Sequence, residues 1–202
     1  MNTALLAVAA YLIGSVSFAV IVSRAFALPD PRTYGSGNPG ATNVLRSGRK
    51  SAAAITLLGD ALKGWLAVWL AVRYASPGDT ELTMALAALL AVIGHMYPVF
   101  HRFQGGKGVA TALGVLFGLH GYIALGTVST WIIMVVFFRM SSLASITAAA
   151  FAPFATWMFY GLSHAFFASV VVMAILLIYR HHANIKKIFN GTESKLGQKA
   201  KV

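Results

Sequence analysis

Glycine and small polar residues are concentrated in the segment from Tyr34 to Arg46, which reads YGSGNPGATNVLR. Glycines allow backbone N–H groups to approach a ligand closely, and the serine, threonine and asparagine side chains add neutral donors. Arg46 adds a planar guanidinium that suits phosphate. The spacing nearly matches a nucleotide-binding P-loop, but Ala41 stands where the lysine would be and no strand is expected before it, which excludes that site. The segment predicts either an anion-binding loop or a flexible linker.

A second unusual segment runs from Gly94 to Gly108 and ends in Gly105-Gly106-Lys107-Gly108, directly before an apolar run. A glycine turn at the start of a helix combines free N–H groups, the positive end of the helix dipole and an ammonium, which together favour phosphate. The alternative is a basic anchor at the membrane interface. An anchor does not need three glycines around one lysine, so we favour a phosphate site.

A third segment runs from Arg180 to Lys187, and the turn Asn190-Gly-Thr-Glu193 follows it. His181 and Asn184 are three residues apart, so on a helix they would share one face, whereas His182 would point elsewhere. An imidazole there could serve as a base near neutral pH. For a single histidine, a half-exposed position at the interface is the more common alternative.

Two charges, Asp60 and Lys63, lie within an otherwise apolar segment and are also three residues apart. Either charge alone would be costly inside a membrane, so we expect them to form a structural ion pair. Ser142, beside Arg139 at the end of another apolar run, could extend the polar cluster.

The composition indicates what must hold these segments in place. Of the 202 residues 58% are hydrophobic and only 10% are charged, too apolar for a single soluble core. We expect one membrane-embedded domain over residues 1–202. The absence of cysteine excludes disulfides and thiolate chemistry. The formal net charge of +11 is better explained by cytoplasmic loops and anionic lipid than by nucleic acid, which we do not expect as a partner.

Apolar runs long enough to cross a bilayer need about 20 residues each. Three single spans are expected, over residues 1–23, Ser51–Val72 and Leu82–Phe100. The next charge-free run, Gly108–Phe138, would be about 46 Å long as one helix, too long for one ordinary span.

A break at His120-Gly121 would divide that run into two helices, and Gly161-Leu162-Ser163-His164 would divide Met140–Tyr179 in the same way. The sequence thus predicts an all-α, polytopic bundle of seven transmembrane helices, with the N-terminus outside and the C-terminus in the cytoplasm.

The distribution of basic residues supports this topology. With seven spans, fourteen of the sixteen lysines and arginines fall on the cytoplasmic side, whereas a single crossing by Gly108–Phe138 would split them seven against eight. The fourteen are Arg24, Arg32, Arg46, Arg49, Lys50, Arg102, Lys107, Arg139, Arg180, Lys186, Lys187, Lys195, Lys199 and Lys201. This arrangement also brings the three polar segments to the same side.

Taken together, the segments resemble the PlsY family of bacterial membrane acyltransferases. The resemblance covers nearly the whole chain and is carried by GSGNPGATN with Arg46, by GH and GGKGVAT around Lys107, by RHxxNI with GTE at Arg180–Glu193, and by Leu57–Gly64. It implies a seven-span fold, a location in the bacterial inner membrane and lysophosphatidate as product. It also implies acyl phosphate as donor, glycerol 3-phosphate as acceptor, and a functional link to the membrane enzyme that makes acyl phosphate.

The resemblance also suggests roles for individual residues. Arg46, Lys107, His181 and Asn184 would be the catalytic residues, with Ser36 and the two cations gripping phosphates. The substrate-binding set would add Ser36, Gly37, Asn38, Gly40, Thr42, Asn43, Gly105, Gly106, Gly108, Ser142 and Glu193. Either His181 or an oxygen of the donor phosphate could accept the proton, with a slight preference for the phosphate. We expect neither a metal nor a cofactor.

Two other classes of protein remain as alternatives. A transporter or exchanger of organic phosphates would also place charges within a helical bundle, but no inverted repeat or broken midplane helix is evident. A purely structural membrane subunit would leave the glycine-rich loops without a purpose.

Overall fold

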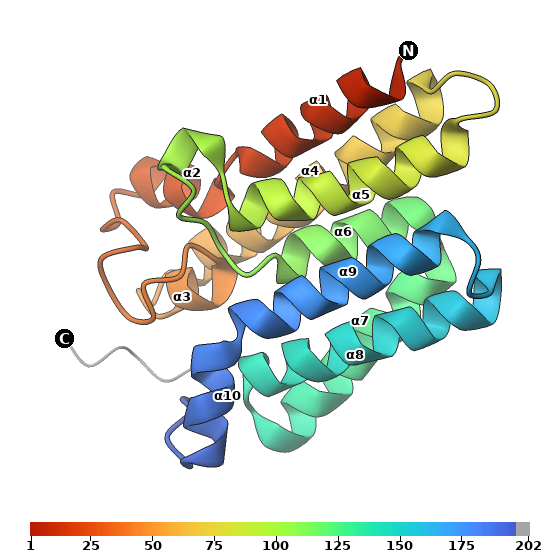
Figure 1. Ribbon diagram of the computed structural model, residues 1–202. Coiled ribbons are helices and arrows are strands. Elements are labelled where there is room, and N and C mark those ends of the chain that lie inside the picture. Colours follow the sequence, from red (N-terminus) through yellow and green to blue (C-terminus); the bar gives the residue numbers. More distant parts are fainter. Residues whose placement is uncertain (197–202) are drawn as a thin grey trace.

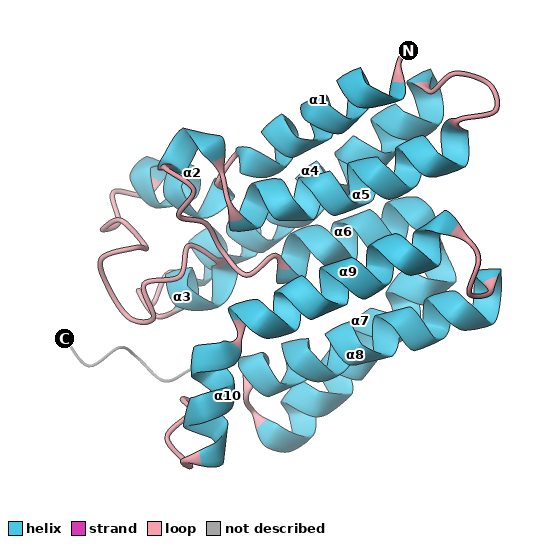
Figure 2. Ribbon diagram, viewed as in Figure 1, coloured by secondary structure: helices cyan, strands magenta, loops and turns pink. Residues whose placement is uncertain are grey.

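The computed structural model describes residues 1–196, and this part of the chain is helical without a strand (Figures 1 and 2). The elements are α1 (Thr3–Ser15), α2 (Phe18–Ala25), α3 (Ala41–Leu45), α4 (Lys50–Tyr74), α5 (Thr80–Met96), the 3-10 turn η1 (Val99–His101), α6 (Val109–Leu119), α7 (Gly121–Phe138), α8 (Ser141–Tyr160), α9 (Ala165–Arg180) and α10 (His182–Phe189). Lys199 and Lys201, which contribute to the predicted charge distribution, and the C-terminus itself lie outside the described residues.

Among residues 1–196, five helical segments are long and apolar enough to cross a membrane: Thr3–Ala25, α4, Thr80–His101, α7 and α8. The pair α9 and α10 would count as a sixth, bent by 57° where the two helices meet. Helix α6 has 11 residues, or about 16 Å of helix, which is shorter than the hydrocarbon core. Seven crossings therefore require α6 to serve as a short span, and this count stays a prediction.

Both predicted breaks are confirmed. Helix α6 ends at Leu119 and α7 begins at Gly121, while Gly161–His164 separates α8 from α9. The first segment differs from the expected continuous helix, because it is interrupted between Ser15 and Phe18. At this break the carbonyl of Val16 accepts a hydrogen bond from the buried Lys63. A partner on another helix therefore satisfies a backbone group that the helix leaves free.

Small residues bring the helices of the bundle unusually close together. A Cβ built on Gly14 of α1 would lie 2.1 Å from the carbonyl oxygen of Ala91 on α5. One built on Gly114 of α6 would lie 1.8 Å from the carbonyl oxygen of Ala61 on α4. Such contacts are typical of membrane helices, whose association depends on close packing rather than on the hydrophobic effect.

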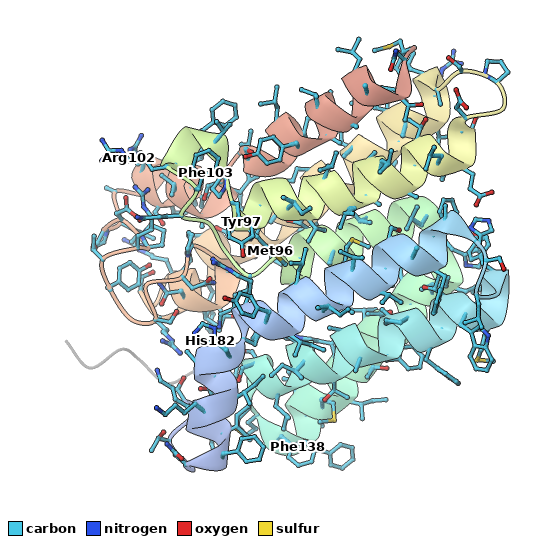
Figure 3. The ribbon with its side chains drawn as sticks, viewed as in Figure 1. Met96, Tyr97, Arg102, Phe103, Phe138 and His182 are labelled. Atoms are coloured by element: carbon cyan, nitrogen blue, oxygen red, sulfur yellow. The ribbon has the colours of Figure 1, made fainter. Side chains whose placement is uncertain are left out.

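The outer surface of the bundle is apolar, as lipid contact requires. Along α7, Val136 and Phe137 are 67% and 77% exposed, an arrangement that water would penalise. The loops with the polar segments, together with α2, α3 and α10, gather at one end of the bundle, opposite the N-terminus (Figure 1). Tyr97 and Arg102 from the chain that follows α5, Phe138 at the end of α7 and His182 at the start of α10 lie at this end in Figure 3.

Candidate functional site

A cavity of about 420 Å³ opens among the three polar segments that the sequence singles out. Most of the predicted site residues border it, including the three phosphate-binding candidates and the histidine of the third segment. These residues are Ser36, Asn38, Gly40, Thr42, Asn43, Arg46, Lys107, Gly108, Ser142, His181, Asn184 and Glu193. Gly37, Gly105 and Gly106 do not border it, and the last two instead shape the loop that carries Lys107.

The first glycine-rich loop is folded around the side chain of Asn43, which is 2% exposed and lies on the short helix α3. Its amide nitrogen donates to the carbonyl oxygens of Pro31 (2.6 Å) and Tyr34 (3.1 Å), and its oxygen accepts from the backbone N–H of Ser36 (3.0 Å). The amide therefore holds the loop itself, a role that we did not predict; Asn43 also borders the cavity, and its expected substrate contact stays a prediction. This arrangement of the loop leaves Ser36 at the cavity.

The second glycine-rich loop is held from outside by Arg180, the last residue of α9. Its guanidinium donates to the carbonyl oxygens of Gly105 (2.7 Å) and Gly106 (3.0 Å), and it stacks 5.3 Å from the ring centre of Tyr97. Gly108, which precedes α6, has φ +84°, a left-handed conformation that favours glycine. Loop and helix start together direct Lys107 toward the cavity.

Lys107 begins a chain of polar contacts that crosses the cavity mouth. Its ammonium donates to the Asn184 side-chain oxygen, and the Asn184 amide donates to Oε1 of Glu193 at 2.7 Å. The same carboxylate oxygen accepts from the hydroxyl of Ser142 at 2.6 Å. Nearby, Arg46 donates to Ser194 at 2.6 Å. Residues from four segments thus form one network of donors around a single carboxylate.

The electrostatics of this mouth are cationic. Burial lowers the pKa of Lys107 to about 8, an effect that Glu193 opposes and that the charges of Arg180 and Arg46 reinforce. A phosphate that enters the cavity would place a negative charge beside this ammonium and stabilise its protonated form. The mouth is therefore suited to an anion.

We expected His181 and Asn184 to lie on one helix. Instead, His181 lies between α9 and α10, at the bend of 57°, and only Asn184 is within α10. Both side chains nevertheless border the cavity, whereas His182 is exposed (Figure 3). Nδ1 of His181 lies 2.8 Å from the carbonyl oxygen of Leu177, to which it can only donate, so the neutral ring keeps a free lone pair on Nε2. Burial, reinforced by the charge of Lys107, lowers the pKa of His181 to about 4.

The deeper part of the cavity is apolar and lies among α6, α7, α8 and α9. Its lining includes Leu113 and Leu116 of α6, Trp131 of α7, Ala149 of α8 and Met173 of α9. A cationic mouth above an apolar interior fits an amphipathic ligand with a phosphate at one end and a hydrocarbon chain at the other.

The ion pair of Asp60 and Lys63 is confirmed, with 2.8 Å between the two charged groups and 3% of each side chain exposed. It is joined by His95, which the sequence motif contains but which we did not predict as a site residue; Arg180 was missed as well. The signal for His95 was its place in the glycine-rich segment, next to Gly94. Within residues 1–196, no group of three or more acidic or histidine side chains is arranged to hold a metal ion.

Comparisons with known proteins agree with this arrangement. The family model for glycerol-3-phosphate acyltransferase matches residues 4–191. The glycerol-3-phosphate acyltransferase of Ralstonia nicotianae is 59% identical, with 98% of this chain and 96% of that protein covered. That of Burkholderia pseudomallei is 57% identical, with 100% and 98% covered.

Two solved structures are also similar. They are crystal structures of PlsY, an integral membrane glycerol 3-phosphate acyltransferase, in its glycerol 3-phosphate and lysophosphatidic acid forms. Their TM-scores are 0.89 and 0.87 at 38% and 37% identity, with 96% of this chain and 96% and 95% of those chains covered. The chain therefore belongs to the PlsY family of glycerol-3-phosphate acyltransferases.

Proposed function

We propose that this membrane acyltransferase moves an acyl group from acyl phosphate to the sn-1 hydroxyl of glycerol 3-phosphate, giving lysophosphatidate and inorganic phosphate. The observation that carries the proposal is the cavity itself, in which two glycine-rich loops with Arg46 and Lys107 adjoin an apolar interior. Both substrates carry phosphate, and only one of them carries a long chain. Two cationic loops above one apolar compartment match that combination.

In this reaction the hydroxyl oxygen of glycerol 3-phosphate attacks the carbonyl carbon of the mixed anhydride. The bond between that carbon and the bridging oxygen breaks, and the bridging oxygen leaves with the phosphate. Arg46, Lys107 and the hydroxyl of Ser36 would hold the phosphates and neutralise their charge. Asn184, with Ser142 and Glu193 behind it, would orient the glycerol end. Positioning and charge neutralisation then supply most of the rate, without a covalent enzyme intermediate.

The hydroxyl proton has two possible acceptors, His181 and the departing phosphate. An imidazole with a pKa of about 4 is a weak base. A phosphate monoester has a second pKa of about 6, so phosphate oxygens are the stronger bases by about two units. We therefore assign the proton to the phosphate, while Nε2 of His181 accepts a hydrogen bond from the hydroxyl and aligns it for attack.

The donor can be tested directly with purified protein. Supplied with glycerol 3-phosphate and acyl phosphate in a chelator, it should form lysophosphatidate, because Arg46 and Lys107 border the cavity and can neutralise the charge of the phosphates. Acyl-CoA of the same chain length should give no product. Activity with acyl-CoA alone would refute the donor assignment, and loss of activity in chelator with recovery on adding metal would refute the metal-free reaction.

We further propose that the site faces the cytoplasm of a bacterial inner membrane, where the enzyme that makes acyl phosphate would supply the donor. The observation behind this is that the polar loops and α10 share one end of the bundle, the end with most of the basic residues (Figure 1). Basic loops are retained in the cytoplasm.

Reporter fusions would test this topology and the count of seven spans. Reporters after Arg73, Arg139 and Val202 should read outside, inside and inside, because seven spans place fourteen of the sixteen lysines and arginines on the cytoplasmic side. An outside reading after Val202, with the other two as expected, would contradict the count of seven and separate the C-terminal segment from the two glycine-rich loops.

A further inference from the structure

The loop that carries Lys107 rests on His95, a residue without a role in the proposed reaction. The backbone N–H of Gly106 donates to the carbonyl oxygen of His95 at 3.1 Å. A Cβ built on Gly106 would lie 2.2 Å from Nε2 of the imidazole and 3.0 Å from the carbonyl oxygen of Pro39. Pro39 belongs to the first glycine-rich loop. The two loops therefore meet at Gly106, directly against the His95 ring.

The orientation of this ring is fixed by its neighbours. Nδ1 of His95 lies 3.0 Å from the ammonium of Lys63, which can only donate a hydrogen bond, so Nδ1 must be the acceptor. The hydroxyl of Thr111 lies 3.1 Å from the same atom and shares its single lone pair as a second donor. A neutral ring then carries its proton on Nε2, the atom that faces Gly106. Thr111 lies in the first turns of α6, so His95 contacts the chain on both sides of Lys107.

Lys63 is in turn held by Asp60 at 2.8 Å, and it also donates to the carbonyl of Val16 at the break between α1 and α2. The two opposite charges balance each other in a buried setting, where a single charge would be costly. Asp60 and His95 both border the cavity. Asp60, Lys63 and His95 thus connect α4, α5 and α6 with the break between α1 and α2, next to the second glycine-rich loop.

We propose that Asp60, Lys63 and His95 form a positioning unit that sets the second glycine-rich loop against the first and thereby places the Lys107 ammonium for phosphate. The inference rests on the proposed role of Lys107 in phosphate binding. It differs from a purely structural ion pair because it makes the affinity for phosphate depend on how these residues hold the loop of Lys107. Asp60 and Lys63 act through His95, and His95 acts through the backbone of Gly106 and the hydroxyl of Thr111.

Thr111→Val removes the contact between the Thr111 hydroxyl and Nδ1 of His95 with little other change, because valine has nearly the same shape as threonine and lacks only the hydroxyl. We expect kcat/KM to fall about 2- to 10-fold, the range that the loss of one ordinary hydrogen bond supports. The alkaline limb of the pH profile should move above pH 8, because a loosened Lys107 loses part of the burial that lowers its pKa. The charges around it, those of Glu193, Arg180, Arg46 and Lys187, remain the same.

Thr83→Val is the matched control. Thr83 is buried to the same extent as Thr111 and its hydroxyl lies 2.8 Å from that of Thr3, in the part of α5 remote from the loops. The substitution removes a buried hydroxyl from a helix contact in the same way, and it should leave kcat/KM and the pH profile unchanged.

The double variant Asp60→Leu with Lys63→Met removes the unit without leaving an unpaired buried charge, so folding should be retained. Thermal unfolding should confirm this, and kcat/KM should fall about tenfold or more, since His95 loses the donor that orients it. Affinity for inorganic phosphate, measured by calorimetry on the solubilised protein, should fall in parallel. Phosphate affinity can be measured even for a variant that has no turnover, so it tests the positioning role independently of catalysis.

Folded variants with wild-type phosphate affinity and wild-type kinetics would overturn the inference and leave a structural ion pair. A wild-type protein that binds phosphate but forms no lysophosphatidate would instead contradict the proposed function. In that case the phosphate affinities of Thr111→Val and the double variant would still decide the positioning role.

Discussion

Lys107→Ala is expected to lower kcat/KM by about 10- to 150-fold, because losing a hydrogen bond from a charged donor removes about 1.5–3 kcal/mol. The glycine backbone and the start of α6 would remain as a partial phosphate frame, so some turnover should persist. Folding should survive, since Lys107 lies in a loop whose shape depends on Arg180 and His95 rather than on the ammonium. The measurement is turnover by equal amounts of folded protein over a range of both substrates.

Lys186→Ala is the control for this result, because Lys186 is an exposed lysine on α10 and does not border the cavity. It should have near-normal activity. Lys107→Arg keeps the charge, but its wider guanidinium would crowd the glycine turn, so we expect partial recovery at best. Near-normal turnover by Lys107→Ala would reduce this residue to a membrane anchor.

The same lysine should set the alkaline limb of the wild-type pH profile. Its pKa in the free protein is about 8, so the ammonium is present below that pH and is lost as the pH rises through it. We therefore expect kcat/KM to decline above about pH 8. In Lys107→Arg the residual activity should extend to higher pH, because a guanidinium keeps its charge.

Ala149→Phe is expected to slow transfer from long-chain acyl phosphates by about 100-fold while leaving short-chain donors little affected. Ala149 is 7% exposed and borders the apolar part of the cavity, so a phenyl ring there would occupy space that the acyl chain needs. Each buried methylene contributes about 0.8 kcal/mol, and excluding about four of them removes about 3 kcal/mol. The measurement is kcat/KM across a series of donor chain lengths.

Ala150→Phe provides the comparison for this series, since the neighbouring Ala150 is exposed on α8 and faces away from the cavity. Its dependence on chain length should match that of the wild type. If Ala149→Phe, once shown to be folded, slowed short and long donors equally, the acyl chain would have to bind elsewhere.

Much of the fold was accessible from the sequence, because a bilayer limits the length of an apolar helix. The run Gly108–Phe138 had to break, and His120-Gly121 was the weakest point within it. The break between α1 and α2 could not be predicted in the same way. The carbonyl that it frees, that of Val16, accepts a hydrogen bond from Lys63, which lies on a different helix and is far away in the sequence.

In the site, too, features that depend on neighbours in the chain could be predicted, whereas contacts between helices could not. The phosphate-binding character of the Lys107 loop follows from local chemistry, since glycines, a lysine and a helix start are neighbours in the chain. The contribution of His95 depends on Lys63, Gly106 and Thr111, which come together only when α4, α5 and α6 pack. The apolar part of the cavity was also missed, because alanines and leucines that line it look the same in sequence as those that face lipid.

The central claim, that one cavity joins acyl phosphate to glycerol 3-phosphate, can be tested by following an oxygen atom. Purified protein would be supplied with acyl phosphate and with glycerol 3-phosphate labelled with ¹⁸O at the C1 hydroxyl, in the presence of a chelator. Attack by that hydroxyl on the carbonyl carbon predicts lysophosphatidate with the label in its ester bond, formed in equal amount with inorganic phosphate. A folded protein that gives no lysophosphatidate, or an ester at C1 without the label, would contradict the account.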